Sequence, residues 1–314
     1  MQKNAKIIFF GTSGFAVPAL EALKKEGYDI VAVVTNPDEP TGRKKVPTPP
    51  PIKTKAQSLG LKVLQPEKLK NDSALVLSLS SLGPDVGIVA AYGKIIPQEI
   101  FGLPRRGTLN IHPSLLPKYR GPTPIQTTIL KGEKETGVTI IKIDGEVDHG
   151  PIVATSDKRQ ATQKSYKELE NELAKLGAEL LIKTLPDYLA GNIEPRPQDH
   201  SQATSTKKFT REDAKIDWPK TAEEIDRQIR ALNPEPGTWT TWNDKILKIL
   251  EAEPLMTETS QWQIGQVFQE EKKIAVKMGA DSLVLKTVQL EGKKPMPVGD
   301  FVRGNRNFIG AVLE

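Results

Sequence analysis

The sequence predicts an α/β protein of two domains, in which a doubly wound domain on a mostly parallel sheet precedes a small β-barrel domain. Strand and helix patterns alternate through about residue 190, which is typical of a parallel sheet covered by helices. Short strand patterns separated by turn residues then recur to the end of the chain, as in small barrels. The length of 314 residues agrees with two domains.

The first domain opens with a strand, a helix and a second strand. KIIFF (6–10) is a short apolar run, GTSG predicts a turn, and FAVPALEALKKEG (15–27) has helical periodicity and ends at a glycine. DIVAVV (29–34) is the second apolar run. The later elements expected here are strands at 61–64, 84–93, 107–112 and 137–144, a short helix at AQSLG (56–60), and helices at 124–130 and 164–191.

A polar, proline-bearing stretch at 192–210 predicts a linker. We therefore expect a catalytic domain at 1–190, a linker at 191–208 and the barrel domain at 209–314. After a helix at 221–232, strand patterns occur at 245–255, 265–269, 273–278, 282–292 and 308–314.

The composition limits which reaction types are possible and in which cellular compartment we expect the protein. The chain has no cysteine, which excludes disulfides, thiolate nucleophiles and cysteine-ligated metals and fits a reducing cytoplasm. No apolar run approaches the roughly 20 residues that span a bilayer, and no secretion signal can be recognised. Since no heptad or apolar stripe demands a partner, we expect a cytoplasmic monomer.

The net charge of +5 lies entirely in the first 200 residues, because residues 201–314 contain 17 basic and 17 acidic residues. The excess concentrates in two loops, 36–55 and 105–120, which indicates an acidic partner. Solvated surface charge is the alternative interpretation. The basic residues of these loops are Arg43, Lys44, Lys45, Lys53, Lys55, Arg105, Arg106, Lys118 and Arg120.

The GTSGF turn after the first strand raises the question of dinucleotide binding. Its spacing differs from G-x-G-x-x-G, and the second strand ends in VVTNPDEP without an acidic residue at its tip to hold a ribose. A tight turn between strand and helix is the favoured interpretation.

Asn110 and His112 lie at the carboxyl end of a predicted parallel strand, where open α/β sheets place their sites. Their i, i+2 spacing on an extended chain puts both side chains on one face. Asp144, Glu146 and Asp148 follow the strand expected at 137–144. One of these acids could meet His112 if the two strands are neighbours.

Such a trio suits acyl transfer to an amine. A carboxylate paired with an imidazole can collect the proton that an attacking amine loses, and amide or imidazole N–H groups can stabilise an oxyanion. Two alternatives stay open at this point: a metal site of His112, His149 and a carboxylate, for which no ligand spacing such as H-E-x-x-H exists, and a purely structural trio.

Two segments, NIHPSLLPKYRGPTPIQ (110–126) and GVTIIKIDGEVDHGPI (137–152), resemble the signature of the folate-dependent formyltransferases. The resemblance extends over nearly the full length in the family's order, and is strongest to the members that act on methionyl-tRNA. The other matching segments are IIFFGTSGFAVPAL (7–20), VVTNPDEPTGRKK (33–45), GIVAAYGKIIP (87–97) and NPEPGTWTTW (233–242).

The resemblance implies a Rossmann-like catalytic domain joined by a linker to an OB-like β-barrel that binds tRNA. It implies 10-formyltetrahydrofolate as formyl donor and initiator methionyl-tRNA as acceptor. From the sequence patterns above we expect no metal, no membrane and no obligate protein partner. Asn110, His112 and Asp148 fall on the family's catalytic positions, and Arg43 falls in the loop that enters the tRNA acceptor end. The folate-associated turn matches Ser114, Leu115, Leu116 and Pro117, and a wall of the pterin pocket matches residues 92–96.

The chain departs from the family's pattern in three places. The loop after Gly42 is shorter than the commoner version, with six prolines between residues 37 and 51. The usual NPWPG reads NPEPG, with Glu235 in place of an aromatic residue, and the barrel domain has no net basic charge for phosphate contacts. A nicotinamide-dependent oxidoreductase, a noncatalytic RNA-binding protein, and a formyltransferase for an amino-sugar nucleotide or glycinamide ribonucleotide are the alternatives. Two local basic clusters could supply phosphate contacts: one at the border of the linker, with Lys207, Lys208 and Arg211, and one near the C-terminus, with Lys293, Lys294, Arg303 and Arg306.

Overall fold

The structure is a computed structural model that describes residues 4–41, 46–255 and 261–314. Within these ranges the chain forms two compact units. The first unit holds the chain up to residue 124, residues 135–160 and residues 168–206, and the second unit holds residues 125–134, 161–167 and 207–314. None of the helices in the described ranges is long and apolar enough to cross a membrane.

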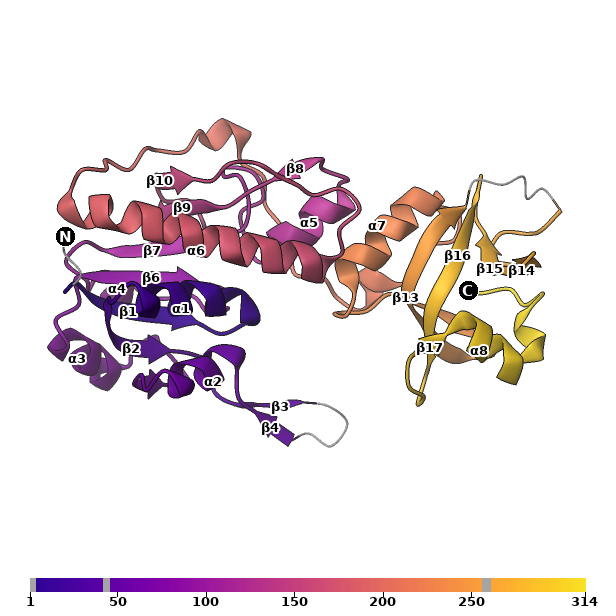
Figure 1. Cartoon of the computed structure of the whole chain (residues 1–314), viewed down its shortest axis with the longest axis horizontal. Coiled ribbons are helices and arrows are strands. Elements are labelled where there is room, and N and C mark those ends of the chain that lie inside the picture. The colour runs from indigo at the N-terminus through magenta and orange to yellow at the C-terminus, as the bar shows by residue number, and fades with distance from the viewer. Residues whose placement is uncertain (1–3, 42–45, 256–260) are drawn as a thin grey trace. The chain divides into compact units, whose positions relative to one another are not determined.

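The first unit is built on a seven-stranded sheet with the order β10-β9-β7-β6-β1-β2-β5 (Figure 1). Neighbouring strands from β5 to β7 pair in parallel, which confirms the predicted mostly parallel sheet. The strands are β1 (Lys6–Gly11), β2 (Asp29–Val34), β5 (Val63–Leu64), β6 (Val86–Ala90), β7 (Thr108–His112), β9 (Thr139–Lys142) and β10 (Ile152–Thr155).

Strands β1 and β6 are continuous apolar runs because they lie at the centre of the sheet. Every residue of β6 is buried, and only Lys6 of β1 is exposed. Ile8, Phe10 and Val34 belong to a core cluster that also contains Leu79 and Tyr92. Burial of each large apolar side chain contributes roughly 1.5–3 kcal/mol, so this core gives the strand ends fixed positions.

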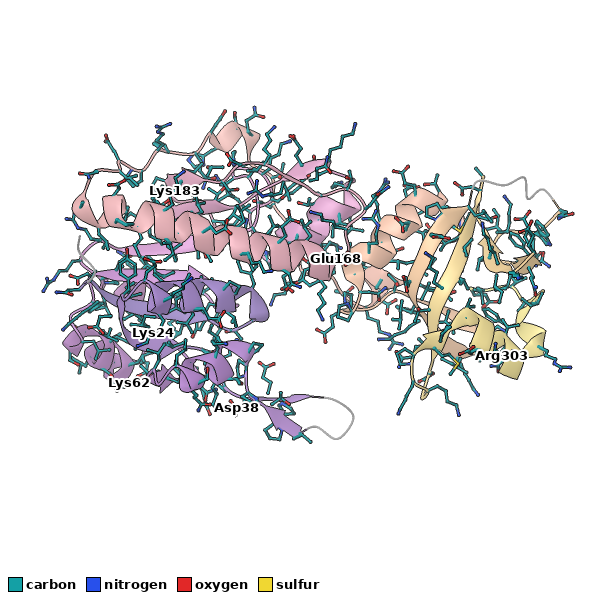
Figure 2. All side chains as sticks on the ribbon, in the orientation of Figure 1. Lys24, Asp38, Lys62, Glu168, Lys183 and Arg303 are labelled. Carbon is teal, nitrogen blue, oxygen red and sulfur yellow. The ribbon has the colours of Figure 1, made fainter. Side chains whose placement is uncertain are left out.

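Helices cover the sheet and present charged side chains to solvent, as at Lys24 and Lys183 (Figure 2). Helix α1 (Val17–Lys25) stops before the predicted end at Gly27, which adopts a left-handed φ of 82°. The other elements of this unit are η1 (Gly14–Ala16), β3 (Glu39–Thr41), β4 (Val46–Thr48), α2 (Pro51–Ser58), α3 (Ser73–Ser81), α4 (Gln98–Phe101), β8 (Glu135–Thr136), β11 (Arg159–Gln160), α6 (Tyr166–Ala190), of which residues 166–167 group with the second unit, and η2 (His200–Gln202).

Strand β9 has a direction that the sequence did not predict. It neighbours β7, as the site hypothesis requires, but runs antiparallel to it, with His112 opposite Thr139 and Leu109 opposite Lys142. The end of β9 therefore lies beside the start of β7, and Asp148 does not follow β9 at the edge that carries His112. It is brought to that edge by the loop 143–151, which folds back before β10 begins. Hydrophobic periodicity identifies a strand without giving its direction, which is why the sequence could not predict this.

The second unit is an open antiparallel barrel with the strand order β12-β13-β16-β15-β14, and β17 pairs with β16. The predicted β-barrel domain is confirmed, and the strand at 245–255 has the predicted bounds. The strands are β12 (Trp239–Trp242), β13 (Lys245–Leu255), β14 (Val267–Glu270), β15 (Lys273–Lys277), β16 (Ser282–Leu290) and β17 (Met296–Pro297); the helices are α5 (Pro124–Leu130), α7 (Ala222–Leu232), α8 (Val298–Gly304), η3 (Glu212–Ala214) and η4 (Arg306–Phe308).

The C-terminal tail differs from the strand predicted at 308–314. After η4 it forms only one isolated bridge, between Gln266 and Val312. The backbone N–H of Val267 donates to the carbonyl of Ala311 at 2.8 Å, and that of Thr241 donates to Glu314 at 2.8 Å. The tail thus joins the two edge strands of the open barrel, and its apolar residues are explained by that position without a regular ladder.

Candidate active site

Asn110 and His112 lie on β7, which pairs with β6 on one side and β9 on the other. Because successive side chains alternate across a strand, both point to the same face of the sheet. The imidazole of His112 is only 4% exposed, at the carboxyl edge that β1, β6 and β7 share. The structure therefore places both residues where the sequence predicts them.

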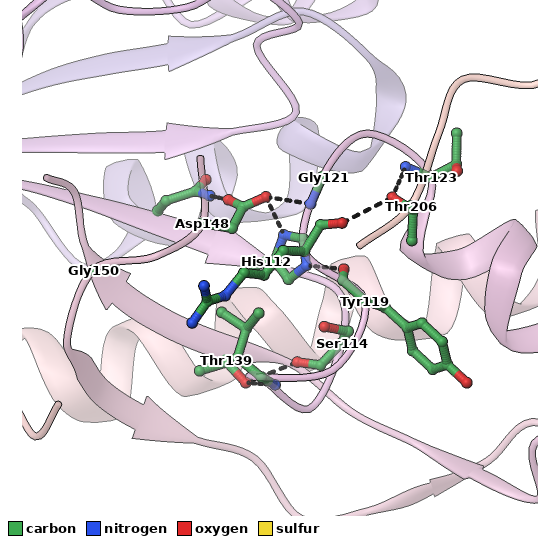
Figure 3. A network of polar contacts seen from close by, with 12 residues as sticks. His112, Ser114, Tyr119, Gly121, Thr123, Thr139, Asp148, Gly150 and Thr206 are labelled. Atoms are coloured by element: carbon green, nitrogen blue, oxygen red, sulfur yellow. Dashed lines mark hydrogen bonds and ion pairs between the residues drawn. The ribbon is translucent and has the colours of Figure 1, made fainter. Parts of the chain in front are cut away.

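The carboxylate of Asp148 meets both side chains, and Figure 3 shows it beside His112. Its Oδ1 accepts a hydrogen bond of 3.0 Å from Asn110 Nδ2, and its Oδ2 lies 3.5 Å from His112 Nδ1. Oδ2 also accepts a bond of 2.8 Å from the backbone N–H of Gly121. Three side chains from two separate segments thus converge at one point, and the carboxylate is held by two N–H donors.

The second nitrogen of His112 fixes the tautomer of the ring. His112 Nε2 lies 2.9 Å from the carbonyl oxygen of Tyr119, which can only accept, so Nε2 carries the hydrogen. In a neutral imidazole Nδ1 then presents its lone pair to Asp148. One further proton would join Nδ1 to the carboxylate, so the pair is arranged to hold a proton taken from a substrate.

The turn predicted to contact folate is closed by its own hydrogen bonds. The hydroxyl of Ser114 donates to the carbonyl of Lys118 at 2.6 Å, and the carbonyl of Ser114 accepts from Thr139 Oγ1 at 2.7 Å (Figure 3). Leu116 is buried, whereas Leu115 and Pro117 are half-buried. Ser114 therefore shapes the turn next to His112, and a folate contact by these four residues stays a prediction.

The loop after β6, predicted as part of the pterin pocket, is tied to two other loops of the same edge. The carbonyl of Tyr92 accepts hydrogen bonds from Thr12 Oγ1 at 2.8 Å and Asn36 Nδ2 at 3.4 Å. The ring of Tyr92 packs edge-on against Phe10, and burial raises the pKa of its hydroxyl to about 12. Ile95, in contrast, is 83% exposed and offers an apolar surface at this edge.

Arg43, predicted to contact tRNA, lies outside the described residues, as do Lys44 and Lys45. The start of its loop is well fixed at Asp38, which accepts hydrogen bonds from Lys53 at 2.7 Å and Gln65 at 2.8 Å. The bonds from Gln65 and Lys53 hold the pKa of Asp38 below its usual value. The charge of Lys53 is thus already paired within the first unit.

The other two histidines form a stacked pair. The rings of His149 and His200 are 4.2 Å apart and nearly parallel, and His149 Nδ1 lies 2.7 Å from Asp144. Among the described residues, no group of three or more histidine, aspartate or glutamate side chains is placed to hold a metal ion. Burial tends to raise the pKa of Asp144, but the hydrogen bonds from His149 and the Glu146 backbone lower it overall.

Sequence reasoning missed the residues that surround the Asp148 loop from the segment after α6. Gln198, His200, Thr204 and Thr206 all lie in the stretch predicted as a linker, yet they bond to the loops that carry Arg120 and Asp148. No composition signal distinguishes them from other polar residues of that stretch. Their contacts span up to 86 positions, so only the folded chain reveals them.

Known proteins match this chain over nearly its full length. Residues 5–185 match the formyl transferase family and residues 208–306 match the formyl transferase C-terminal domain. The methionyl-tRNA formyltransferase of Roseiflexus castenholzii is 45% identical over 96% of this chain and 97% of its own length. That of Halalkalibacterium halodurans is 42% identical over 98% of both chains.

Solved structures agree with the fold. The methionyl-tRNA formyltransferase from Clostridium thermocellum matches with a TM-score of 0.53 at 18% identity, over 90% of this chain and 99% of its own. HypX from Aquifex aeolicus, solved in complex with tetrahydrofolic acid, matches with a TM-score of 0.67 at 17% identity, over 94% of this chain and 46% of its own.

Proposed function

We infer that this chain, which belongs to the methionyl-tRNA formyltransferase family, transfers the formyl group of 10-formyltetrahydrofolate to the amino group of methionyl-initiator tRNA. The observation that carries this function is the near full-length similarity to methionyl-tRNA formyltransferases, at 40–46% identity. The product is N-formylmethionyl-tRNA for the initiation of translation.

The geometry of the site supports direct attack of the amine on the formyl carbon. Asn110 has a second N–H beyond the one that it donates to Asp148, and this group can stabilise the oxyanion. His112 and Asp148 can together take the amine proton, because the lone pair of Nδ1 and the carboxylate face each other. As the new C–N bond forms and the bond to N10 breaks, a proton must reach N10 of the leaving folate.

The residues of the carboxyl edge fit a folate as substrate. Ile95 offers an exposed apolar side chain after β6, and the turn 114–117 follows His112 directly. Apolar surface beside a few fixed polar groups is typical of sites for flat heteroaromatic ligands. We therefore assign the folate contacts to the turn formed by Ser114, Leu115, Leu116 and Pro117. The hydrogen bonds of Ser114 give this turn its shape.

We assign the tRNA contacts to Arg43 and to the second unit. This assignment follows the proposed domains. Residues 1–190 bind folate, residues 209–314 bind tRNA, and the linker 191–208 joins them. The finer proposals are that the chain works as a monomer, in the cytoplasm, without a membrane or a protein partner. Gel filtration with light scattering checks the first of these.

One experiment tests reaction and acceptor together. The protein is incubated with 10-formyltetrahydrofolate labelled in the formyl carbon and with charged initiator tRNA, charged elongator methionyl-tRNA, or a nucleotide-linked amino sugar. We expect label on the initiator tRNA in large excess over the other two acceptors. Transfer only to the amino sugar, or to none of the three, would contradict the proposed function.

A further inference from the structure

The segment 196–206, which we name the strap, belongs to the first unit and lies next to the loops that carry Arg120 and Asp148. Arg196 pairs with Ile152 of β10 through two backbone hydrogen bonds of 2.7 and 2.8 Å. Farther along, Thr204 and Thr206 bond to the backbone of Arg120 at 2.8 and 2.7 Å. The strap is thus anchored to the sheet at one end and to the loop 119–123 at the other.

Gln198 of the strap is 5% exposed and holds the Asp148 loop by its backbone. Its Nε2 donates to the carbonyl of Asp148 at 2.9 Å and to the carbonyl of Gly150 at 2.8 Å. Its Oε1 accepts from Arg120 Nε at 3.1 Å and from Arg120 Nη2 at 2.7 Å. Since the carbonyls only accept and the guanidinium only donates, the orientation of the carboxamide is determined, and both of its N–H groups are in use.

The Asp148 loop needs such support because its backbone is strained and confined. Asp148 has a left-handed φ of 50°, a region that residues other than glycine rarely adopt unless their surroundings hold them there. At Gly150 a Cβ atom would lie 1.8 Å from the carbonyl oxygen of Lys142, so the loop passes too close to β9 for any larger residue. Without external bonds nothing in this loop fixes the direction of the Asp148 side chain.

Arg120 links the two sets of contacts that reach Asp148. Its guanidinium orients Gln198 and lies 2.9 Å from His200 Nδ1, which must accept because arginine only donates. Its neighbour Gly121 donates to the Asp148 carboxylate, and Tyr119 accepts from His112. The same short loop therefore contacts both His112 and Asp148, and the strap bonds to that loop on both sides of Arg120.

We propose that Gln198 is a positioning residue for Asp148. Its two N–H groups hold the backbone of the loop so that the carboxylate stays between Asn110 and His112, and Arg120 fixes the orientation of its carboxamide. This inference rests on the proposed function. Because a displacement of about 1 Å can slow a reaction on the order of 10²-fold, loss of these bonds should lower turnover more than binding.

The first test is Gln198→Glu in the full-length protein. The glutamate keeps the size of the side chain and a pairing with Arg120, but it turns an acceptor towards two carbonyl oxygens. The matched control is Gln202→Glu, the same charge change at an exposed position of the strap. We expect kcat for formyl transfer to fall roughly 10- to 100-fold for Gln198→Glu, with both KM values changed less than about threefold, and Gln202→Glu to match wild type.

Thermal unfolding identifies a variant that fails to fold, and Gln198→Met then serves instead, since it removes the donors without adding a charge. A kcat within twofold of wild type in a folded Gln198 variant would overturn the proposal. So would a rise in KM at unchanged kcat, which indicates a role in binding.

A double-mutant cycle separates positioning from a general structural effect. If Gln198 acts through Asp148, Gln198→Glu should change the rate of an Asp148→Ala enzyme by less than about threefold, although it slows the wild-type enzyme much more. Full additivity of the two changes would overturn the proposal.

A readout without an acceptor keeps this inference separate from the proposed function. The imidazole C–H resonances of the three histidines can be followed by NMR in the free protein. We expect Gln198→Glu, but not Gln202→Glu, to move the His112 resonance. An unmoved His112 resonance would overturn the positioning role, whereas an enzyme inactive with every tRNA would overturn the proposed function only.

Discussion

The ionisable side chains of the candidate site at the carboxyl edge of the first sheet are largely buried, whereas those on the surface of the second unit are exposed. At the edge, His112 and Asp148 are 4% and 11% exposed, and each has hydrogen-bond partners in fixed positions. In the second unit, ion pairs such as Lys286–Glu253 and Arg303–Asp300 have side chains that are 43–77% exposed. Exposed pairs contribute roughly 0–1 kcal/mol, whereas buried polar networks lose much when one member is removed. We therefore expect substitutions at the edge to impair the reaction, and we expect the stability of the second unit to depend on its apolar core.

The largest effect should come from the buried edge. Changing His112→Ala or Asn110→Ala should lower turnover on the order of 10²- to 10⁴-fold, because the proton acceptor or the oxyanion donor is lost. Steady-state formyl transfer measures this, with Leu77→Ala, an exposed position of α3, as the control. Turnover within threefold of wild type in either variant would remove the catalytic assignment from that residue.

The apolar core of the second unit gives the next effect, on stability. Phe301 packs edge-on between Trp242 and Phe308, with ring centroids 5.4 and 5.0 Å away. Phe301→Ala should lower the free energy of unfolding by about 3–5 kcal/mol, measured by urea titration. Arg303→Ala, at an exposed ion pair of the same helix, should cost less than about 0.5 kcal/mol. Equal losses in the two variants would contradict the comparison.

Removal of a helix N-cap in the second unit should have a smaller effect on stability. Thr221 and Glu224 form a capping box at the start of α7, in which each side chain bonds to the backbone of the other. The backbone N–H and the hydroxyl of Thr221 both donate to the Glu224 carboxylate and lower its pKa. Thr221→Ala should cost about 1 kcal/mol in chemical unfolding, and Thr221→Ser, which keeps the hydroxyl, a few tenths. Equal stability of the Ala and Ser variants would show that the cap contributes nothing.

The smallest effect should come from the carboxylate of Asp213, whose side chain is 25% exposed. Hydrogen bonds from Lys207 and Thr210 lower the pKa of Asp213 to about 2. A lowered pKa means that the contribution is present above the unfolded value of about 3.9 and is lost as the pH falls through about 2. The stability advantage of wild type over Asp213→Asn should therefore be constant above about pH 5 and shrink below about pH 4. An advantage that grows on acidification would contradict this assignment.

Sequence patterns predicted those helices and strands whose ends are set by neighbouring residues. The bounds of β13 and α5 match the predicted ranges, because periodicity and flanking turn residues define them. Helix α3 was not predicted, although Asp72 caps it by accepting from the N–H of Leu75. The direction of β9 and the irregular tail depend on pairing between distant segments, which no local window contains.

The residues of the candidate site also fall into those that the sequence could predict and those that it could not. Asn110 and His112 could be predicted from their spacing at a strand end, while Asp148 required a family resemblance to distinguish it from Asp144 and Glu146. Gln198 could not be predicted, because its contacts lie 48 and 50 positions away and its own segment is uniformly polar. Asn110 and His112, which are proposed to act on the substrate, carry a local signal, whereas Gln198, which is proposed to position Asp148, carries none.

If Asn110, His112 and Asp148 act together in formyl transfer, as we propose, Asp148→Asn should impair the chemical step. The variant keeps the size of the side chain and removes the charge and the proton acceptor. A single-turnover measurement with excess enzyme reports the chemical step alone. The account predicts a rate lower on the order of 10²- to 10⁴-fold with folate binding unchanged. A single-turnover rate within threefold of wild type would contradict it.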